Sequence, residues 1–350
     1  MADKPKIDYK SAGVNIDAGN EAVARIKTAV HSTYTPAVLS ELGSFGSFFD
    51  LTTIIRDYRQ PVLVQSIDGV GTKIIIARLM NKYDTIGRDL VSACANDILV
   101  HGARPLTFLD YIANDRLDPA VVEAIVSGMA AACRETGVAL VGGETAEMPD
   151  TYRRGENDLV GIVTGVVERD KIINGSAIRP GDVLIGIESS GLHTNGYSLA
   201  RKLVFEVGGF TVDSCPPELD RSVGETLLEP HLNYTALVLG LIDAGIAING
   251  IAHITGGGFI DNLPRVLPAD CAAEIRLGSW PMQPVFPFLQ GLGNLDAYEM
   301  YRTFNMGIGL IMAVPQSTAA QALEQISAIT NFNAGLIGRV VAGRREIKLI

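Results

Sequence analysis

The sequence predicts an α/β protein of two domains, on three observations. The chain has 350 residues, which is about two domains at roughly 150 residues each. Strand-like apolar runs alternate with helical patterns through both halves of the chain. A polar, turn-rich segment, residues 169–182, interrupts this alternation and carries the breaker sequence Arg-Pro-Gly-Asp. We therefore expect one domain over residues 1–170 and a second over residues 171–350.

The elements of the first half follow from apolar runs and the signals at their ends. Pro119 suits the first position of a helix, and Gly137 suits the residue after its end. The expected order is a strand over 61–67, a helix over 89–101, a strand over 105–113, a helix over 119–136, and strands over 139–147 and 158–168.

The second half repeats the alternation and completes the α/β pattern. The expected order is a strand over 183–191, a helix over 196–207, a long helix over 223–244, a loop over 253–258, strands over 271–277 and 306–314, a helix, and a last strand over 334–343. No short repeat or low-complexity tract occurs in the sequence, so a solenoid or a tether is not supported.

The charge balance excludes a protein that follows a nucleic-acid backbone. The chain carries 39 acidic and 29 basic side chains, a formal net charge of −10, whereas nucleic-acid binding of that kind requires a broad basic face. A phosphorylated ligand would therefore need a local site.

Cysteine spacing and hydropathy predict a protein of the reducing cytoplasm with no membrane contact. The first ten residues lack the apolar stretch of a signal peptide, and no apolar run reaches the roughly 18 residues of a membrane span. The cysteines form no Cys-x-x-Cys pair, so we expect them to be small buried side chains and not zinc ligands; they are Cys94, Cys133, Cys215 and Cys271.

Several glycine-rich loops lie where a predicted strand ends, which is where open α/β folds bind ligands. Glycine lets the main chain approach a ligand closely, and free N–H groups at a helix start favour an anion. Each loop alone also suits a simple turn. The P-loop and dinucleotide patterns are both missing. The loops are residues 42–49, 68–73, 142–147, 189–196 and 253–258.

Carboxylates near these loops suggest a magnesium site, because hard oxygen ligands suit Mg²⁺ better than zinc. On the helix predicted around residues 89–101, Asp89 and Asn96 share a face because they are seven residues apart. A helix cap for Asp89, or a satisfied hydrogen bond for Asn96 or Asp97, remains the structural alternative. The candidate carboxylates are Asp68, Asp97, Asp110 and Glu144.

Two further side chains are candidates for the chemistry. Lys73 follows two glycines and could set a positive charge against a phosphate, with a solvated lysine as the alternative. His193 lies in a loop with little apolar packing, which favours it over His31 or His231 for substrate contact or proton transfer. The remaining histidines, at 101 and 253, suit capping or packing. No Gly-x-Ser-x-Gly occurs, so covalent acyl chemistry has no support.

Seven segments, taken in order, resemble those of one enzyme family. The segments are YKSAGVNIDAGN, DGVGTK, DTIGRDLVSACANDILVHGARPLTFLDY, GGETAEMP, SSGLHTNGYSLARK, HITGGGFIDNLPRVLP and YRTFNMGIG. Over nearly the whole chain the sequence resembles the phosphoribosylformylglycinamidine cyclo-ligases, also called AIR synthetases, of purine biosynthesis.

The resemblance implies an α/β fold of the α+β type. The N-terminal domains of two subunits would pair into a β-barrel-like core, giving a homodimer, and the C-terminal α/β domain would complete the cleft. The implied reaction is ATP-dependent closure of formylglycinamidine ribonucleotide to 5-aminoimidazole ribonucleotide, with release of ADP and phosphate. ATP would phosphorylate the formyl amide oxygen, and the amidine nitrogen would then attack intramolecularly. The implied cofactors are ATP, Mg²⁺ and a monovalent cation such as K⁺.

The resemblance also assigns roles to individual residues. The implied catalytic residues are Lys73, His193 and Asp97, and the implied metal ligands are Asp68, Asp97, Asp110 and Glu144. ATP and its phosphates would contact Lys27, Gly43, Gly46, Asp68, Gly69, Gly71, Thr72, Lys73 and Asn96. The ribonucleotide would contact Glu144, Thr145, His193, Thr194, Asn195, Gly256, Gly257 and Gly258.

Three positions depart from the family's pattern. Asn15 removes one carboxylate from the N-terminal motif, Asp150 replaces a glycine, and Thr194 replaces a serine while keeping the hydroxyl. None of these removes an essential group. Two other functions remain as alternatives: a sister activity of the same superfamily, such as thiamine-phosphate kinase, selenophosphate synthetase or hydrogenase maturation factor, and a nucleotide-binding protein without chemistry.

Overall fold

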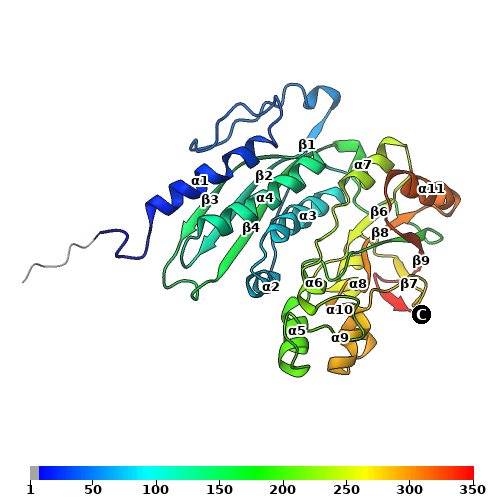
Figure 1. The fold of residues 1–350 in the computed structure, drawn as a ribbon. Helices are drawn as coiled ribbons and strands as arrows, with labels where there is room; N and C mark the ends of the chain where they lie inside the picture. The colour runs from blue at the N-terminus through cyan, green and yellow to red at the C-terminus, as the bar shows by residue number, and fades with distance from the viewer. Residues whose placement is uncertain (1–7) are drawn as a thin grey trace, which may run out of the picture.

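The computed structural model describes residues 8–350, which form two α/β units that meet along a broad junction (Figure 1). In the first unit the strands are arranged in the order β1-β4-β2-β3. Strand β4 is antiparallel to both neighbours, whereas β2 and β3 are parallel. The strands are β1 (Pro61–Gly69), β2 (Arg104–Asn114), β3 (Ala139–Glu147) and β4 (Asn157–Glu168).

Helices cover one face of this sheet (Figure 1). Helix α4 begins where the Asp118 carboxylate accepts a hydrogen bond from the Ala120 N–H, and it ends at Gly137, whose φ is 70°. Helices α3 and α4 approach closely, because a Cβ on Gly87 or Gly128 would lie 2.0 Å from a main-chain oxygen of the other helix. The helices are α1 (Ile16–His31), α2 (Lys73–Met80), α3 (Asp84–Leu99) and α4 (Pro119–Thr136).

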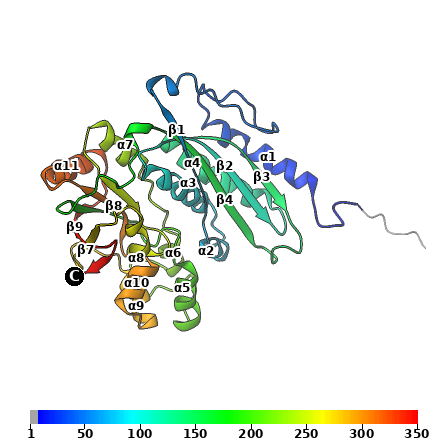
Figure 2. The same ribbon diagram turned by 180° about the vertical axis from the view of Figure 1, so that it is seen from behind.

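Within residues 8–350, no helix lies over the other face of the β1-β4-β2-β3 sheet (Figure 2). Side chains alternate along a strand, so every second residue of β1 points to this face. Leu63 and Ile67 are 59% and 66% exposed there, and Leu109 of β2 is 37% exposed. Apolar side chains in a row on an uncovered sheet face are typical of an interaction surface.

The second unit is built on a sheet in the order β10-β7-β9-β5-β8-β6. Strand β8 is buried at all seven positions, so it forms the centre of this core. The strands are β5 (Val183–Glu188), β6 (Gly250–His253), β7 (Cys271–Ile275), β8 (Ile308–Val314), β9 (Ala334–Ala342) and β10 (Ile347–Leu349).

Short helices connect these strands. Helix α5 continues as a π-helix over Lys202–Val207. The α-helices are α5 (Tyr197–Arg201), α6 (Val223–Leu227), α7 (Thr235–Asp243), α8 (Gly258–Asn262), α9 (Val285–Gly293), α10 (Ala297–Thr303) and α11 (Ala319–Ile329). Short 3-10 helices span Ile55–Asp57, Arg169–Lys171, Leu263–Arg265 and Gln316–Thr318.

Three expectations from the sequence are wrong. The long helix over 223–244 is two helices, α6 and α7, separated by residues 228–234, because Pro230 has no N–H for a helix and disfavours helical geometry before it. Helix α3 begins at Asp84, five residues before the expected start at Asp89. Cys215 is exposed, whereas the other three cysteines are buried.

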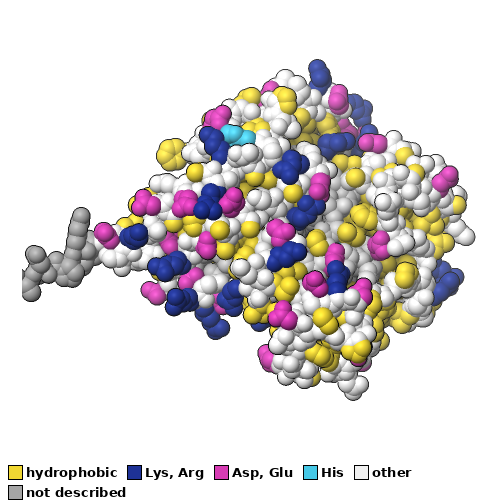
Figure 3. All heavy atoms as spheres, in the orientation of Figure 1, with side chains coloured by type: hydrophobic (Ala, Val, Ile, Leu, Met, Phe, Trp, Pro, Cys, Tyr) yellow, Lys and Arg dark blue, Asp and Glu magenta, His cyan; other side chains and the backbone are white. Residues whose placement is uncertain are grey.

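Charges are interspersed over the face shown in Figure 3, where Lys and Arg side chains lie next to Asp and Glu. Among the described residues, no helix is both long and apolar enough to cross a membrane.

Candidate active site

The glycine loop after β1 meets the 189–196 loop of the second unit. Gly71 has a φ of 53°, and a Cβ there would lie 3.6 Å from the Thr194 carbonyl oxygen. Thr72 Oγ1 lies 3.3 Å from Ser198 Oγ. A Cβ on Gly256 would lie 3.3 Å from Asn195 Oδ1. The structure therefore brings the loops 68–73, 189–196 and 253–258 together where the two units join.

Three histidines lie side by side under this junction. The rings of His193 and His231 stack with their centroids 3.9 Å apart and an interplanar angle of 20°. His231 Nε2 lies 3.2 Å from His253 Nε2. Nitrogen lone pairs lie in the ring planes, so two stacked rings do not direct them at one ion. The cluster is therefore a stacked pair, His193 and His231, with His253 in contact through Nε2, and not a metal centre.

Burial keeps two of these imidazoles uncharged. Desolvation lowers the pKa of His193 and of His231 well below the ordinary value, and the neighbouring His253 adds to the effect. His193 has a φ of 59°, and its Nδ1 has no hydrogen-bond partner among the described residues. His193 was predicted in an open substrate loop, yet it is 1% exposed.

The proton on His231 follows from its neighbours. Asn96 Oδ1 accepts the Tyr234 N–H at 3.0 Å, which orients the amide so that Nδ2 donates to His231 Nε2 at 3.2 Å. A neutral imidazole with an accepting Nε2 carries its proton on Nδ1. That Nδ1 lies 3.4 Å from Thr194 Oγ1. His231 thus connects helix α3 to the 189–196 loop.

Asp68 and Asp97 form the acidic part of the junction. Asp97 Oδ1 lies 2.8 Å from His253 Nδ1, and its Oδ2 accepts a hydrogen bond from Ser66 Oγ at 3.2 Å. Burial raises the pKa of Asp68, and the nearby Asp97 charge raises it further, while the Gly69 N–H lowers it. Two adjacent carboxylates, one of them partly desolvated, are a suitable ligand set for a divalent cation.

Asp110 and Glu144 do not join this pair. In the strand register, Asp110 lies opposite Gly161, which lies opposite Asp68, so a whole strand separates the two carboxylates. Asp110 pairs with Gly143, so Glu144, the next residue along β3, points to the opposite face of the sheet. The four predicted metal ligands therefore do not form one cluster.

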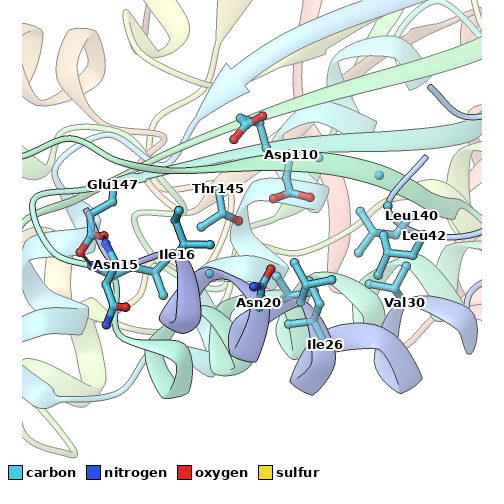
Figure 4. Close-up of a pocket in the computed structure, with 18 of the residues that line it drawn as sticks. Asn15, Ile16, Asn20, Ile26, Val30, Leu42, Asp110, Leu140, Thr145 and Glu147 are labelled. Atoms are coloured by element: carbon cyan, nitrogen blue, oxygen red, sulfur yellow. Dashed lines mark hydrogen bonds between the residues drawn. The ribbon is translucent and has the colours of Figure 1, made fainter. Parts of the chain in front are cut away.

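A cavity of about 380 Å³ lies between α1 and the edge of the sheet (Figure 4). Asp110 and Thr145 face Asn20 of α1 across it, and burial raises the pKa of Asp110 to about 7. Of the residues predicted to bind nucleotide or substrate, Gly43, Glu144 and Thr145 line or border the cavity, whereas Lys27 and Gly46 are exposed outside its lining.

Glu147 fastens the start of α1 over this cavity. Its carboxylate accepts hydrogen bonds from the Asn15 N–H and, at 2.9 Å, from the Leu117 N–H. Asn15 replaces an acidic residue of the family pattern, but its contact here is made by the main chain. Its side chain makes no capping hydrogen bond to α1.

Lys73 is not placed as a phosphate ligand in this structure. Its side chain is fully buried, and its ammonium lies 2.7 Å from Asp89 Oδ2 and donates to the Glu229 carbonyl at 2.7 Å. Asn96 is also fully buried. Both were predicted to contact ATP, and both contact the second unit of the protein instead.

Sequence reasoning missed several residues of this junction. His231 was ranked below His193, and His253 was assigned to capping or packing, yet both lie at its centre. Their signals were present but weak: His253 directly precedes a glycine loop, and His231 follows a proline inside a predicted helix. Glu147, at the end of a glycine-containing strand, had no distinctive signal.

Comparison with known proteins extends over both units. Residues 53–167 match the N-terminal domain, and residues 179–349 the C-terminal domain, of AIR synthase related proteins. The phosphoribosylformylglycinamidine cyclo-ligase of Trichlorobacter lovleyi is 50% identical over 337 residues, which is 96% of this chain and 95% of that protein. The protein of the same name from Bifidobacterium animalis is 51% identical over 317 residues, 90% and 91% of the two chains.

More distant solved structures share the fold. Thiamine-monophosphate kinase from Stenotrophomonas maltophilia superposes with a TM-score of 0.69 at 18% identity, covering 94% of this chain and 95% of that one. Hydrogenase maturation protein HypE in complex with ATP gives a TM-score of 0.64 at 20% identity, covering 93% and 90%. The cyclo-ligases differ from these solved structures in sequence identity, because about half of their residues match this chain over both units. The chain therefore belongs to the phosphoribosylformylglycinamidine cyclo-ligase family.

Proposed function

We propose that this enzyme closes formylglycinamidine ribonucleotide to 5-aminoimidazole ribonucleotide, using ATP and releasing ADP and phosphate, in purine biosynthesis. The observation that carries the proposal is the identity of 50% over 96% of the chain with a protein of that name. The sister activities share the fold at 18–20% identity. Fold alone does not assign chemistry, so the nearer relatives favour the cyclo-ligase reaction.

The chemistry places specific demands on the site. An amide oxygen leaves poorly, so it must first become a phosphate ester, after which the amidine nitrogen attacks the same carbon. The protein mainly has to align the reacting atoms and neutralise phosphate charge. Loops from both units meet at Gly71, Asn195 and Gly256, so both units can contribute groups to a ligand at the junction.

The acidic residues of the junction suit Mg²⁺. Asp68 and Asp97 would hold the cation, with His253 and Ser66 fixing the Asp97 carboxylate. When bound there, Mg²⁺ would neutralise negative charge on the ATP phosphates. ATP, Mg²⁺ and a monovalent cation such as K⁺ are the proposed cofactors. The glycines at the end of β1 would let the phosphates approach the main chain.

A separate place is proposed for the rest of the nucleotide. The cavity under α1 combines apolar walls from Val30, Leu42 and Leu140 with the polar groups Asn20 and Thr145. Its volume of about 380 Å³ lies in the range of small-molecule sites. Gly43 at its edge has a φ of 96° with open space around the Cβ position, so the 42–49 loop can approach a ligand.

We also propose that two copies pair through the uncovered face of the first sheet, and that the enzyme acts in the cytoplasm. The exposed Leu63 and Ile67 of β1 and Leu109 of β2 give that face its apolar row. Pairing two such faces would cover both rows and bring two sheets together.

Turnover tests the proposed reaction. Purified protein is incubated with MgATP, with and without formylglycinamidine ribonucleotide, while ADP and the aminoimidazole are measured. ADP formation that requires the ribonucleotide and equals aminoimidazole formation supports the proposal. ATP consumption that requires thiamine monophosphate or selenide in place of the ribonucleotide, with ADP or AMP as the nucleotide product, would assign a sister activity. ATP binding with none of these substrates consumed would indicate a protein without chemistry.

A further inference from the structure

Residues 228–234, which separate α6 from α7, are held by buried side chains of the other unit. Lys73, Asp89 and Asn96, which we call the clasp, all come from α2 and α3 and are 0% exposed. The Lys73 ammonium donates to the Glu229 carbonyl at 2.7 Å. Asp89 Oδ1 accepts the His231 N–H at 2.7 Å.

Asn96 completes the clasp with its whole amide group. Its Nδ2 donates to the Leu232 carbonyl at 2.9 Å, and its Oδ1 accepts the Tyr234 N–H at 3.0 Å. The clasp therefore satisfies four main-chain groups of a non-helical segment. Buried main-chain polar groups without such partners are costly, so the clasp fixes the path of this segment across the junction.

The clasp has a direct consequence for the active site. It fixes the main chain of His231 on both sides, while the imidazole reaches His253 Nε2 at 3.2 Å and Thr194 Oγ1 at 3.4 Å. His253 in turn contacts Asp97. A displacement of residues 228–234 would therefore move a group that contacts both the carboxylate side and the loop side of the junction.

We propose that Lys73, Asp89 and Asn96 are positioning residues that hold residues 228–234, and through His231 set the positions of Asp97 and Thr194, and that Lys73 does not bind phosphate. The Lys73 ammonium already has Asp89, the Glu229 carbonyl and the face of the Tyr197 ring around it, the last at 5.7 Å. An ammonium has three donors and no acceptor, and this one is enclosed.

The first test uses the unmodified enzyme and amine acetylation followed by mass spectrometry. Lys202 is exposed and serves as the internal control. The clasp predicts that Lys73 reacts at least ~10-fold more slowly than Lys202, with or without saturating MgATP, because only local opening exposes it. Rapid acetylation of Lys73 that MgATP suppresses would overturn the proposal and identify Lys73 as a phosphate ligand.

The second test removes the charge pair. Lys73→Met alone leaves the Asp89 carboxyl buried without its cation and is expected to lower the melting temperature by ~10 °C. Lys73→Met combined with Asp89→Asn keeps an acceptor for the His231 N–H and is expected to recover most of that loss. The affinity of the double variant for MgATP should stay within ~3-fold of the parent's. A loss of ~10-fold or more, with stability restored and amide hydrogen exchange at residues 228–234 no faster than in the parent, would contradict the proposal.

The third test asks whether His231 positions the site. His231→Phe should lower kcat by ~10-fold or more with the KM for ATP little changed, and His231→Gln, which keeps polar contacts, should recover part of the loss. Equal kcat in all three proteins would overturn the positioning role. The measurement of kcat rests on the proposed function. Acetylation, melting temperature and ATP affinity do not require ring closure, so the positioning proposal and the proposed function can fail separately.

Discussion

Asp68 lies at the end of β1, where the glycine loop begins. Substitution of its carboxyl group tests the proposed cation site at a single residue. We predict that Asp68→Asn lowers turnover by ~100-fold or more, since a neutral amide is a much weaker ligand for Mg²⁺. Its melting temperature should be unchanged or higher, because burial already disfavours the Asp68 charge. Steady-state turnover and thermal unfolding measure the two effects.

A matched control is available in α7. Asp243→Asn removes an equal charge from a side chain that is 70% exposed, pairs with Arg104 at 3.9 Å, and belongs to none of the loops that meet at the junction. It should leave turnover unchanged. If Asp68→Asn behaves like this control, Asp68 does not hold the cation.

The pKa of Asp110 predicts that the stability of the folded protein depends on pH. Its pKa in the folded protein is about 7, above the roughly 3.9 of an exposed carboxyl. The folded state therefore binds this proton more tightly than the unfolded state, and its stability falls as the pH rises from about 4 to about 7. Relative to the parent, Asp110→Asn should gain at most roughly 2 kcal/mol between pH 5.5 and pH 8. Urea unfolding at both pH values measures this, and a gain independent of pH would contradict it.

At the scale of elements, helix α1 depends on Glu147 for its fixed start. We predict that Glu147→Ala speeds amide hydrogen exchange at residues 15–20 by ~10-fold, because the Asn15 N–H loses its acceptor and the start of α1 loses its link to the Leu117 N–H. The affinity for ATP should fall as well, since α1 forms one wall of the proposed nucleotide cavity. Hydrogen exchange with mass spectrometry and equilibrium binding provide the two readouts.

Glu21→Ala is the control for α1 itself. Glu21 is exposed and pairs with Arg25 one turn along the same helix, so its loss should cost only a few tenths of a kcal/mol. Faster exchange without weaker ATP binding in Glu147→Ala would place the nucleotide outside this cavity.

For the whole molecule, the uncovered sheet face predicts the state of assembly. Leu63→Glu places a charge in the apolar row of β1, where Leu63 is 59% exposed, and should convert a dimer to a monomer because an unpaired interface charge is costly. Sedimentation velocity measures the change. Leu79→Glu, on the 51% exposed Leu79 of α2, is the matched control. A parent protein that sediments as a monomer would contradict the pairing.

Over the whole molecule, the sequence predicted some helices and strands and missed others. Apolar runs and end signals predicted β1, β2, β3, β4 and α4 within a few residues, because these elements follow local patterns. Pro230 marks the break between α6 and α7 locally, but the path of residues 228–234 depends on contacts with Lys73, Asp89 and Asn96, which lie more than 130 residues away in the chain. Such contacts cannot be predicted from the local periodicity of the sequence.

In the candidate site, too, the sequence predicted one part and missed another. The loops that meet at the junction were predicted, since glycines and polar residues at strand ends are visible in the sequence. The burial of Lys73 and His193 was not, because exposure is decided by packing between the two units. Identical residue types at a surface and in a core look alike in a sequence, and only the fold separates them.

The proposed chemistry is tested most directly by following one oxygen atom. Formylglycinamidine ribonucleotide labelled with ¹⁸O in its formyl amide is converted with unlabelled MgATP, and the released phosphate is analysed by mass spectrometry. Phosphorylation of that oxygen before ring closure predicts one ¹⁸O in each phosphate formed. Unlabelled phosphate, with the label lost to water, would contradict the account.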